Sequence, residues 1–253
     1  MTIYRQAARL AETLPAMKIA SAAREIASIP ADGVTKAKLE AAWGTAATKP
    51  SIAEFCAVAA QASLSGGEIA AALRAASETM NLVRNENQVD LIWTGPQTSA
   101  IPVRRNEQAM CELIDGAKKE LFIVSFVAVN AKNVYASINK AISRGVKVSF
   151  LAESSIENGG TLDTSDPVTI LHEKFPSATC YRWSCTGSAK KHCVHVKCAV
   201  ADGGVALVTS ANLTGAAMDT NMELGVLIRS KEIAGKLAAH LTALVDENII
   251  KAI

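Results

Sequence analysis

At 253 residues, about half of them apolar, the chain is long enough to bury one large core or two small ones. Its formal net charge of +2 argues against a strongly basic protein that coats nucleic acid, but it allows a local basic patch. The N-terminal residues show neither the apolar core of a signal peptide nor a stretch that could span a bilayer. We therefore expect a soluble, cytoplasmic protein whose six cysteines are reduced.

Residues 1–88 have the pattern of a small α-helical region. Apolar residues recur at helical spacing in segments that Pro15, Pro30 and Pro50 interrupt. The helices expected from this spacing cover residues 3–14, 17–29, 35–43, 52–62 and 69–83. Ser65 and Glu68 have the spacing of a capping box that starts the last helix. A helical bundle that packs on the rest of the chain or on a partner is favoured over a DNA-binding helix-turn-helix, because the basic residues are too dispersed.

Residues 89–253 alternate between strand and helix patterns, after a polar boundary at residues 85–88. The expected strands are residues 89–93, 121–128, 146–151, 178–184, 195–202, 205–208 and 222–229. The expected helices run over residues 106–119, 133–144, 167–174 and 231–248. The succession of strand, helix and strand over residues 121–151 is typical of two parallel strands with a right-handed crossover. The predicted fold class is therefore α/β, a mixed β-sheet flanked by helices and preceded by a small α-helical region.

Polar residues in the C-terminal third are spaced for chemistry on a small anion. The sequence contains H-x-K-x4-D, then Thr-Ser-Ala-Asn at residues 209–212, then a carboxylate eleven residues later. The candidate residues are His195, Lys197, Asp202, Ser210, Asn212 and Glu223. Together they supply a nucleophile, a cation and neutral hydrogen-bonding groups.

Strand geometry predicts how the first of these residues point. Side chains alternate between the two faces of a strand, so His195 and Lys197 would share one face. The same alternation would turn Val196, Cys198 and Val200 into the packing. A Gly-Gly turn and a second apolar strand follow, which would bring the two halves of the set together.

Cleavage of a phosphodiester requires an in-line nucleophile, stabilisation of charge on the non-bridging oxygens and an acid for the leaving oxygen. A neutral imidazole at His195 is the candidate nucleophile, and Glu223 is the candidate to accept the hydrogen of its other ring nitrogen. Lys197, Ser210 and Asn212 would bind the phosphoryl oxygens.

This set resembles the signature of the phospholipase D superfamily, which is H-x-K-x4-D, then Gly/Ser-Ser-x-Asn, then a downstream carboxylate. The resemblance covers about residues 89–253 and is most specific over residues 195–223. It implies an α/β sandwich, a covalent phosphohistidine at His195 and no metal or other cofactor. Thr209 stands where the superfamily usually has Gly, which we expect to stiffen the turn without removing a catalytic group. Asp202 is expected to hold the turn or support its partner motif rather than act as the base.

The superfamily mechanism uses two His-Lys sets, whereas this chain has one complete set. His172 and Lys174 repeat the spacing, but they fall in a predicted helix, where residues two apart do not share a face, and Thr179 replaces the Asp. We therefore expect a homodimer that pairs two copies of His195 across a two-fold axis. A monomer with a borrowed acid, or a heteromeric partner, is the alternative.

A short basic segment precedes the signature. Arg182, Lys190, Lys191 and His192 are candidates for binding the phosphates of a nucleic acid without reading its sequence. A solvated basic loop at residues 190–192 is the alternative.

Cysteines and histidines are dense over residues 180–198, which offers a zinc site as another possibility. No Cys-x2-Cys knuckle is present, and strand alternation separates Cys198 from His195. Free and mostly buried thiols are therefore expected, with no metal.

The favoured function is a metal-independent phosphodiesterase, specifically a nuclease that acts on DNA. A lipid hydrolase or transphosphatidylase is the second hypothesis, which the lack of a membrane-seeking segment and the basic segment disfavour. The third is a non-catalytic scaffold of a defence complex that binds its partners through residues 1–88.

The defence setting follows from the order of motifs along the whole chain. A helical region leads to Leu-Ile-Trp-Thr-Gly-Pro, then Ile-Pro-Val-Arg-Arg, Leu-Phe-Ile-Val-Ser-Phe and one signature that ends Thr-Ser-Ala-Asn-Leu-Thr. This order is similar to that of the phospholipase D-like component of the bacterial DISARM anti-phage systems. The resemblance implies other phage-defence subunits as partners.

Overall fold

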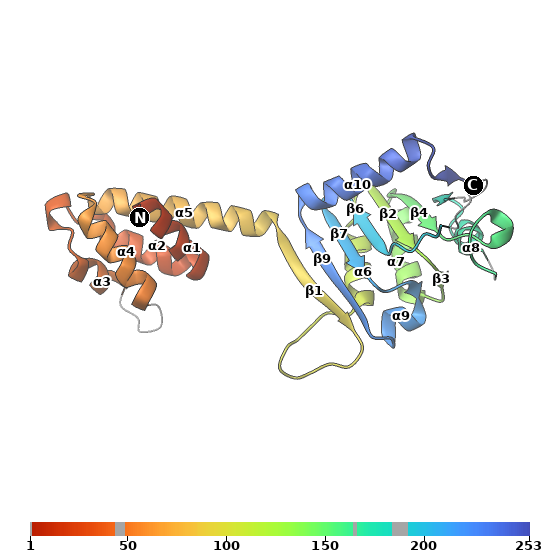
Figure 1. The fold of residues 1–253 in the computed structure, drawn as a ribbon, viewed down its shortest axis with the longest axis horizontal. Coiled ribbons are helices and arrows are strands. Elements are labelled where there is room, and N and C mark those ends of the chain that lie inside the picture. The colour runs from red at the N-terminus through yellow and green to blue at the C-terminus, as the bar shows by residue number, and fades with distance from the viewer. Residues whose placement is uncertain (1, 44–48, 164–165, 184–191) are drawn as a thin grey trace. The chain divides into compact units, whose positions relative to one another are not determined.

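The computed structural model describes residues 2–43, 49–163, 166–183 and 192–253. The chain divides into two compact units, Met1–Glu86 and Asn87–Ile253, which Figure 1 draws in sequence colours.

The first unit is helical, as the apolar spacing predicts. Its elements are α1 (Ile3–Thr13), α2 (Ala16–Ala27), the 3-10 helix η1 (Ala31–Gly33), α3 (Lys36–Trp43), α4 (Lys49–Gln61) and α5 (Gly66–Glu86). Fully buried side chains from different helices, such as Leu10, Ile26, Phe55 and Leu73, form one core. Burial of these apolar faces stabilises helices that are individually marginal in water.

The start of α5 confirms the predicted capping box. The backbone N–H of Ser65 donates to Glu68 Oε2 at 2.8 Å, and the N–H of Glu68 donates to Ser65 Oγ at 3.3 Å. These bonds lower the pKa of the Glu68 carboxyl. Residue 66 has to be glycine because α5 starts against the end of α2. A Cβ at Gly66 would lie 1.9 Å from the carbonyl oxygen of Ile26.

The second unit is built on a mixed sheet. Its strands are β1 (Gln88–Thr94), β2 (Glu120–Ser125), β3 (Ala128–Val129), β4 (Lys147–Ala152), β5 (Thr179–Arg182), β6 (Cys198–Ala201), β7 (Val205–Thr209), β8 (Leu213–Thr214), β9 (Glu223–Arg229) and β10 (Lys251–Ala252). Over the described residues the main sheet has eight strands in the order β1-β9-β7-β6-β2-β4-β5-β10, and β3 pairs with β8 separately. The predicted α/β class is confirmed.

Parallel pairing is confined to the middle of the sheet. Strand β2 pairs in parallel with β4, and β4 with β5, whereas the other pairs of the main sheet are antiparallel. The parallel β2 and β4 flank α7 (Lys132–Ser143), which confirms the strand-helix-strand unit predicted over residues 121–151.

Helices cover both faces of this sheet (Figure 1). The other helices of the unit are α6 (Asn106–Gly116), the 3-10 helix η3 (Ile156–Asn158), α8 (Pro167–Lys174), α9 (Gly215–Asp219) and α10 (Lys231–Asp246). Apolar side chains of α6, α7, α8 and α9 pack on one face in the larger core. Helix α10 packs on the other face, against β6 and its neighbours. The alternating side chains of the central strands therefore enter two separate cores.

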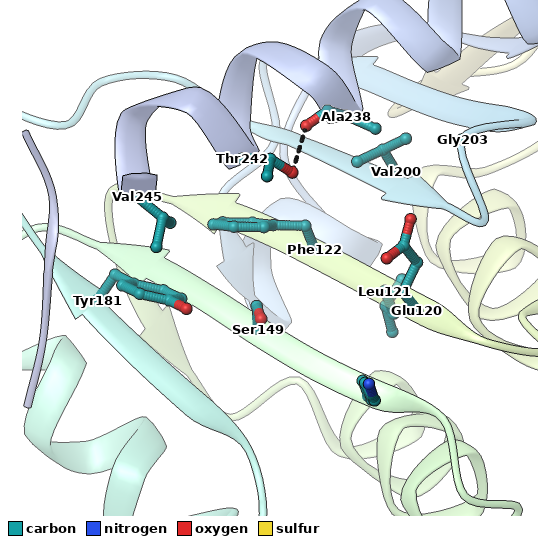
Figure 2. A pocket seen from close by; sticks show the side chains of 11 residues that line it. Glu120, Leu121, Phe122, Ser149, Tyr181, Val200, Gly203, Ala238, Thr242 and Val245 are labelled. Atoms are coloured by element: carbon teal, nitrogen blue, oxygen red, sulfur yellow. Dashed lines mark hydrogen bonds between the residues drawn. The ribbon is translucent and has the colours of Figure 1, made fainter. Parts of the chain in front are cut away.

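Helix α10 leaves part of the sheet face that it packs on uncovered. A cavity of about 180 Å³ lies between α10 and strands β2, β4 and β5. Figure 2 shows the side chains that line it. The rings of Phe122 and Tyr181 stack there with centroids 5.8 Å apart. None of the residues that line this cavity belongs to the predicted catalytic set.

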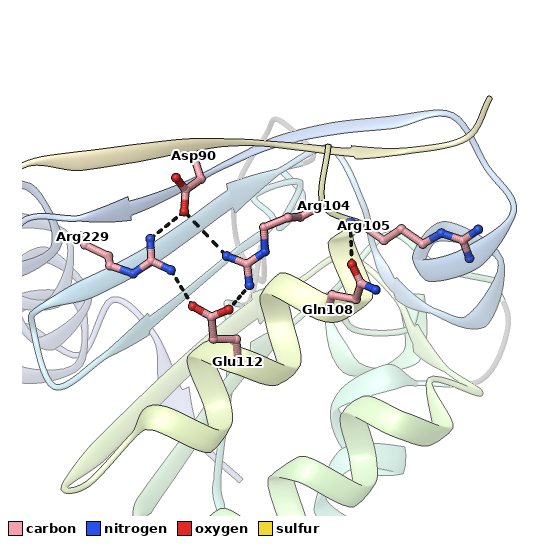
Figure 3. A network of polar contacts seen from close by, with 6 residues as sticks. All are labelled: Asp90, Arg104, Arg105, Gln108, Glu112 and Arg229. Carbon is pink, nitrogen blue, oxygen red and sulfur yellow. Dashed lines mark hydrogen bonds and ion pairs between the residues drawn. The ribbon is translucent and has the colours of Figure 1, made fainter. Parts of the chain in front are cut away.

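A cluster of opposite charges ties the loop before α6 to the sheet (Figure 3). Arg229 Nη1 lies 2.6 Å from Asp90 Oδ2, and its other terminal nitrogen contacts Glu112. Arg104 contacts the same two carboxylates, so the guanidinium groups and carboxylates alternate. Because these groups are partly exposed, the cluster is worth little per pair but fixes the geometry of β1, β9 and α6.

The structure departs from the prediction at the start of β6. Strand β6 begins at Cys198, so residues 195–197 precede the regular strand. Thr209 N still donates to the carbonyl oxygen of Lys197 at 3.1 Å, but Ser210 N already bonds to Leu224 on β9. Val196 therefore has no neighbouring strand to pack on, and the prediction that it is buried is wrong, since it is 57% exposed. Cys198 and Val200 are buried as predicted.

Candidate active site

Three neighbouring strands bring the predicted residues together. Strand β7 runs antiparallel to β6 on one side and to β9 on the other. The end of β7 therefore lies beside the starts of β6 and β9. His195 and Lys197 precede β6, Ser210 and Asn212 follow β7, and Glu223 is the first residue of β9. Residues 28 positions apart along the chain thus share one end of the sheet.

Ser210 joins β7 to β9 at this end. Its backbone N–H donates to the carbonyl oxygen of Leu224 at 2.9 Å, and its Oγ accepts from the N–H of Leu224 at 3.1 Å. The same hydroxyl donates to Oε2 of Glu223. Asn221 Nδ2 lies 3.5 Å from the other oxygen of that carboxylate. The carboxylate of Glu223 is therefore held between two neutral donors.

His195 is exposed and lies against an aromatic ring. Its imidazole centroid is 5.4 Å from that of Phe126, which follows β2, and the two rings are tilted by 59°. Its backbone N–H donates to the carbonyl oxygen of Cys193 at 3.0 Å. The ring makes no hydrogen bond to any described residue, so both of its nitrogens are available to a substrate.

Lys197 lies beside the same ring. Its Nζ lies 5.8 Å from the Phe126 centroid and donates to the carbonyl oxygen of His195 at 2.8 Å. Partial burial lowers the pKa of the Lys197 ammonium, and the negative charge of Glu223 opposes that change. A desolvated cation beside a nucleophile suits the binding of a phosphoryl oxygen.

Asn212 occupies the turn between β7 and β8. Its side-chain Oδ1 is buried and has no hydrogen-bond partner among the described residues. Its carbonyl oxygen accepts from the N–H of Thr214 at 2.8 Å. The amide is thus held by packing and by its backbone, at the same end of the sheet as Ser210.

Asp202 lies at the opposite end of β6. Its carboxylate accepts from the backbone N–H groups of Lys118, Lys119 and Glu120 at 2.8, 2.8 and 2.9 Å. Desolvation raises the pKa of the Asp202 carboxyl, but these bonds and the Lys119 charge outweigh it and lower that pKa overall. Asp202 and Gly203 both have positive φ, at 52° and 58°, as a tight hairpin turn requires. The structure therefore separates Asp202 from the other five residues and gives it an anchoring position.

The bond expected between His195 and Glu223 is not formed in this structure. Glu223 contacts Ser210 and Asn221 instead. An orienting role of Glu223 toward the imidazole stays a prediction.

The predicted phosphate-binding residues differ in their surroundings. Arg182 ends β5, and its Nη2 lies 3.6 Å from Asp166 Oδ2, so its charge is already partnered. His192 is exposed, and its ring stacks on Trp183 with centroids 5.3 Å apart. Lys190 and Lys191 lie outside the described residues.

The sequence analysis missed two residues near the site, because nothing in the neighbouring sequence marks them. Phe126 lies against both His195 and Lys197, and it could have been suspected only from its place after a buried strand. Glu153 follows β4, is 1% exposed, and accepts from the N–H of Val194. Its other oxygen accepts from the N–H and the hydroxyl of Thr161 at 2.9 and 3.1 Å. Glu153 thus fixes the segment that leads into His195.

The thiols proposed as zinc ligands do not converge where the structure describes them. Cys180 lies in the core of the α8 face and Cys198 in that of the α10 face, so the sheet separates them. Burial raises the pKa of each thiol to about 11. Cys193 is exposed, and Cys185 lies outside the described residues. Across the described residues, no group of three histidine, cysteine or acidic side chains is arranged to hold a metal ion.

No helix in the described part of the chain is long and apolar enough to cross a membrane.

Comparisons with known proteins identify the family of the second unit. A family model described as "Cardiolipin synthase, PLD-like domain" matches residues 110–245, which include every member of the predicted catalytic set. A comparison with curated protein sequences gave no significant match.

Solved structures give a similar result for the fold. Nuc of Salmonella typhimurium, a phospholipase D family member, is 19% identical with a TM-score of 0.50, over 66% of this chain and 99% of that one. Phosphatidylserine synthase of Haemophilus influenzae is 15% identical with a TM-score of 0.51, over 75% of this chain and 48% of that one. NucT of Helicobacter pylori is 16% identical with a TM-score of 0.49, over 64% and 97% of the two chains.

Proposed function

We propose, on the premise that this chain belongs to the phospholipase D-like domain family, that it is a metal-independent phosphodiesterase that cleaves DNA. The observation that supports the chemistry best is the convergence of a nucleophile, a cation and neutral donors at one end of β6, β7 and β9. No other cluster of the described residues combines these three groups with an exposed imidazole.

The proposed reaction has two displacements. A ring nitrogen of His195 attacks phosphorus, the bond from phosphorus to the leaving oxygen breaks, and that oxygen takes a proton from an acid. Water then attacks the phosphohistidine, which releases the phosphate product and restores the imidazole. Lys197 and Asn212 bind the non-bridging oxygens, where negative charge accumulates in both transition states. Ser210 and Glu223 hold the hydrogen-bond network at the start of β9.

Nucleic acid is the substrate that the chain's charge pattern favours. A basic segment precedes His195 in the sequence, and lysine or arginine contacts to phosphate are independent of base sequence. A lipid substrate is the outcome to consider if DNA is not cut.

We also propose that the active form is a homodimer that pairs two copies of His195. In each turnover His195 of one copy attacks phosphorus, and the protonated His195 of the other copy gives its proton to the leaving oxygen. The support is the single motif and an apolar rim around it. Val196, Val208, Met222 and Leu224 flank the site residues in sequence and are 44–65% exposed. Large exposed apolar side chains grouped around a site suit a partner surface.

The dimer has a direct test in light scattering after gel filtration. Leu224→Asp should convert a dimer to a monomer and reduce cleavage together. Met17→Asp is the matched control, because Met17 is 85% exposed on α2, away from the rim residues in sequence. An active monomer of the wild type would overturn the proposal and favour an acid supplied within one chain.

The nuclease proposal is tested by cleavage of labelled single- and double-stranded DNA in excess EDTA. Wild type should cut, and His195→Ala should lose roughly a thousandfold or more in rate while its thermal unfolding is unchanged. Cleavage that needs added metal would contradict the mechanism. Failure of the wild type on DNA, with turnover of phosphatidylcholine vesicles, would move the substrate to lipid. Failure on both substrates would favour the scaffold.

We further propose that the enzyme serves a bacterial anti-phage system of the DISARM kind, on the strength of the resemblance in motif order alone. A cell that carries the whole system should lose protection against phage when His195 is replaced by Ala. Protection that survives the substitution and requires residues 1–86 would favour a scaffold role.

A further inference from the structure

The turn that carries Ser210 and Asn212 is anchored by a buried polar network. Thr209 Oγ donates to Asn106 Oδ1 at 2.6 Å, and Asn106 is the first residue of α6. The backbone N–H and Nδ2 of Asn106 both donate to Thr94 Oγ, at 3.2 and 3.0 Å. Thr94 and Asn106 are fully buried. The end of β7 is therefore tied to the end of β1 and the start of α6 by uncharged groups.

This network reaches the site through one backbone group. Thr209 Oγ accepts from the N–H of Ala211 at 3.0 Å, and Ala211 immediately precedes Asn212. On the other side, the N–H of Leu213 donates to Oγ of the buried Ser125 at 2.9 Å. Both backbone neighbours of Asn212 are thus fixed by hydroxyls, that of the partly buried Thr209 and that of the buried Ser125. The buried Oδ1 of Asn212 has no partner among the described residues. The position of the Asn212 amide depends on these two anchors.

The neighbouring strand makes room for the threonine. Gly225 lies opposite Thr209 in the ladder between β7 and β9. A Cβ at Gly225 would lie 2.9 Å from the Cβ of Thr209, closer than real side chains approach. The chain therefore combines a branched side chain at residue 209 with the absence of one at residue 225.

We propose that Thr209 is a positioning residue for the phosphodiesterase reaction and acts through Ala211 on the Asn212 amide. The proposal rests on the proposed function of the site. The Thr209 hydroxyl links the turn to α6 and β1 by hydrogen bonds, which a glycine at this position could not form. A fixed amide needs no reorganisation when charge develops on the phosphoryl oxygen, which favours the transition state over the bound substrate.

Isosteric substitutions separate this role from simple stability. Thr209→Val keeps the shape and removes the hydroxyl, whereas Thr209→Ser keeps the hydroxyl. We expect Thr209→Val to lower kcat by roughly tenfold to a hundredfold with little change in KM, and Thr209→Ser to restore most of it. Thr242→Val is the control, because the hydroxyl of Thr242 donates to the carbonyl oxygen of Ala238 within α10, away from the site. It should leave kcat unchanged.

A double-mutant cycle tests whether the effect passes through Asn212. If it does, Thr209→Val should cost little in an Asn212→Ala background, because the group that it positions is already absent. An equal loss of kcat in both backgrounds, or Thr209→Ser as impaired as Thr209→Val, would overturn the proposal.

A readout that does not need catalysis separates this proposal from the proposed function. The side-chain NH₂ of Asn212 gives its own pair of NMR signals, whose heteronuclear relaxation reports its order. Order should fall in Thr209→Val and be retained in Thr209→Ser and Thr242→Val. Unchanged order in Thr209→Val would overturn the positioning role even if DNA is cut. Reduced order in a protein that cuts no DNA would uphold the anchor and contradict only the nuclease.

Discussion

The two ends of the central sheet use charged residues in different ways. At the far end, Asp202 accepts three backbone hydrogen bonds, and Arg229 is paired with two carboxylates. At the site end, the imidazole of His195 has no hydrogen bond within the described residues, and Lys197 bonds only to a carbonyl of its own segment. The charges of Asp202 and Arg229 are therefore satisfied by protein groups where the fold is held together, whereas the side chains of His195 and Lys197 are available where a substrate would bind.

This difference divides one sequence motif into two functions. His195 and Lys197 precede β6 and Asp202 follows it, so the strand places them at opposite ends. Spacing alone presents the three residues as one set, whereas the structure gives the first two a chemical environment and the third an anchoring one. Substitutions at the two ends should therefore affect activity and stability separately.

The largest expected effect is at the site end. Lys197→Met removes the cation beside His195 and should lower kcat/KM by about a hundredfold to a thousandfold. Its free energy of unfolding should change little, because the ammonium makes one hydrogen bond and is partly desolvated. Steady-state cleavage and urea unfolding measure the two quantities on the same preparation. A loss of unfolding free energy as large as the loss of transition-state stabilisation would contradict the claim that substitutions at the site end affect activity alone.

Lys197 also sets a pH dependence. Burial lowers the pKa of its ammonium, so the charge is present at neutral pH and is lost on the alkaline side earlier than for an ordinary lysine. The alkaline limb of kcat/KM should therefore fall below the ordinary lysine pKa, and Lys197→Arg should move it upward because arginine stays protonated. The same alkaline limb in both proteins would assign it to another group.

Glu153 lies near the site, yet its carboxylate is fully hydrogen-bonded, like that of Asp202 at the far end of the sheet. Its substitution should therefore affect both stability and activity. Glu153→Gln replaces one acceptor by an NH₂ group that faces a backbone N–H, and should cost about 1–3 kcal/mol of unfolding free energy. It should also lower kcat, since the N–H of Val194 next to His195 loses its partner. Glu157→Gln, at an exposed position of η3, is the matched control, and thermal unfolding with kinetics is the measurement.

At the far end the effect should be on stability alone. Asp202→Asn should cost about 1–2 kcal/mol, by analogy with the loss of a helix cap, and solvent screening keeps it toward the lower value. The folded-state pKa of Asp202 is lowered, so its contribution is present above the unfolded pKa near 3.8 and is lost as pH falls through the folded value. The difference in unfolding free energy between wild type and variant should therefore shrink below about pH 4. Loss of kcat in folded Asp202→Asn would mean that the two ends are coupled.

The smallest effect is expected in the exposed charge cluster. Arg104→Gln leaves Asp90 and Glu112 paired with Arg229, so the cost should be under about 1 kcal/mol and should decrease further in high salt. Chemical denaturation at two salt concentrations measures it. A larger, salt-independent cost would show that the cluster is effectively buried.

Local pattern was enough to predict most elements of the fold. The parallel β2 and β4, the capping box at Ser65 and the helix that contains His172 follow from apolar period and turn chemistry, which act over a few residues. The bounds failed where contacts beyond the local sequence decide them: regular strand β6 begins only at Cys198, and the N–H of Ala211 bonds to the Thr209 hydroxyl rather than to residues 195–197.

For the candidate site too, the sequence predicted the residue types but not their long-range contacts. Spacing identified residue types that suit phosphoryl transfer, and the strand order brings five of them to one end. It could not show that Asp202 bonds to residues more than 80 positions earlier, or that Thr209 bonds to Asn106. Such contacts depend on the assembled sheet and leave no mark on the neighbouring sequence.

The most direct test of the central claim is to trap the covalent intermediate. Wild type would be mixed with an oligonucleotide carrying ³²P at the scissile phosphate, quenched in base within milliseconds to seconds, digested and mapped, with His195→Ala in parallel. The expected result is label on the peptide that contains His195 in the wild type and none in the variant. Cleavage by the wild type with label on another residue, or equal label in the variant, would contradict His195 as the nucleophile.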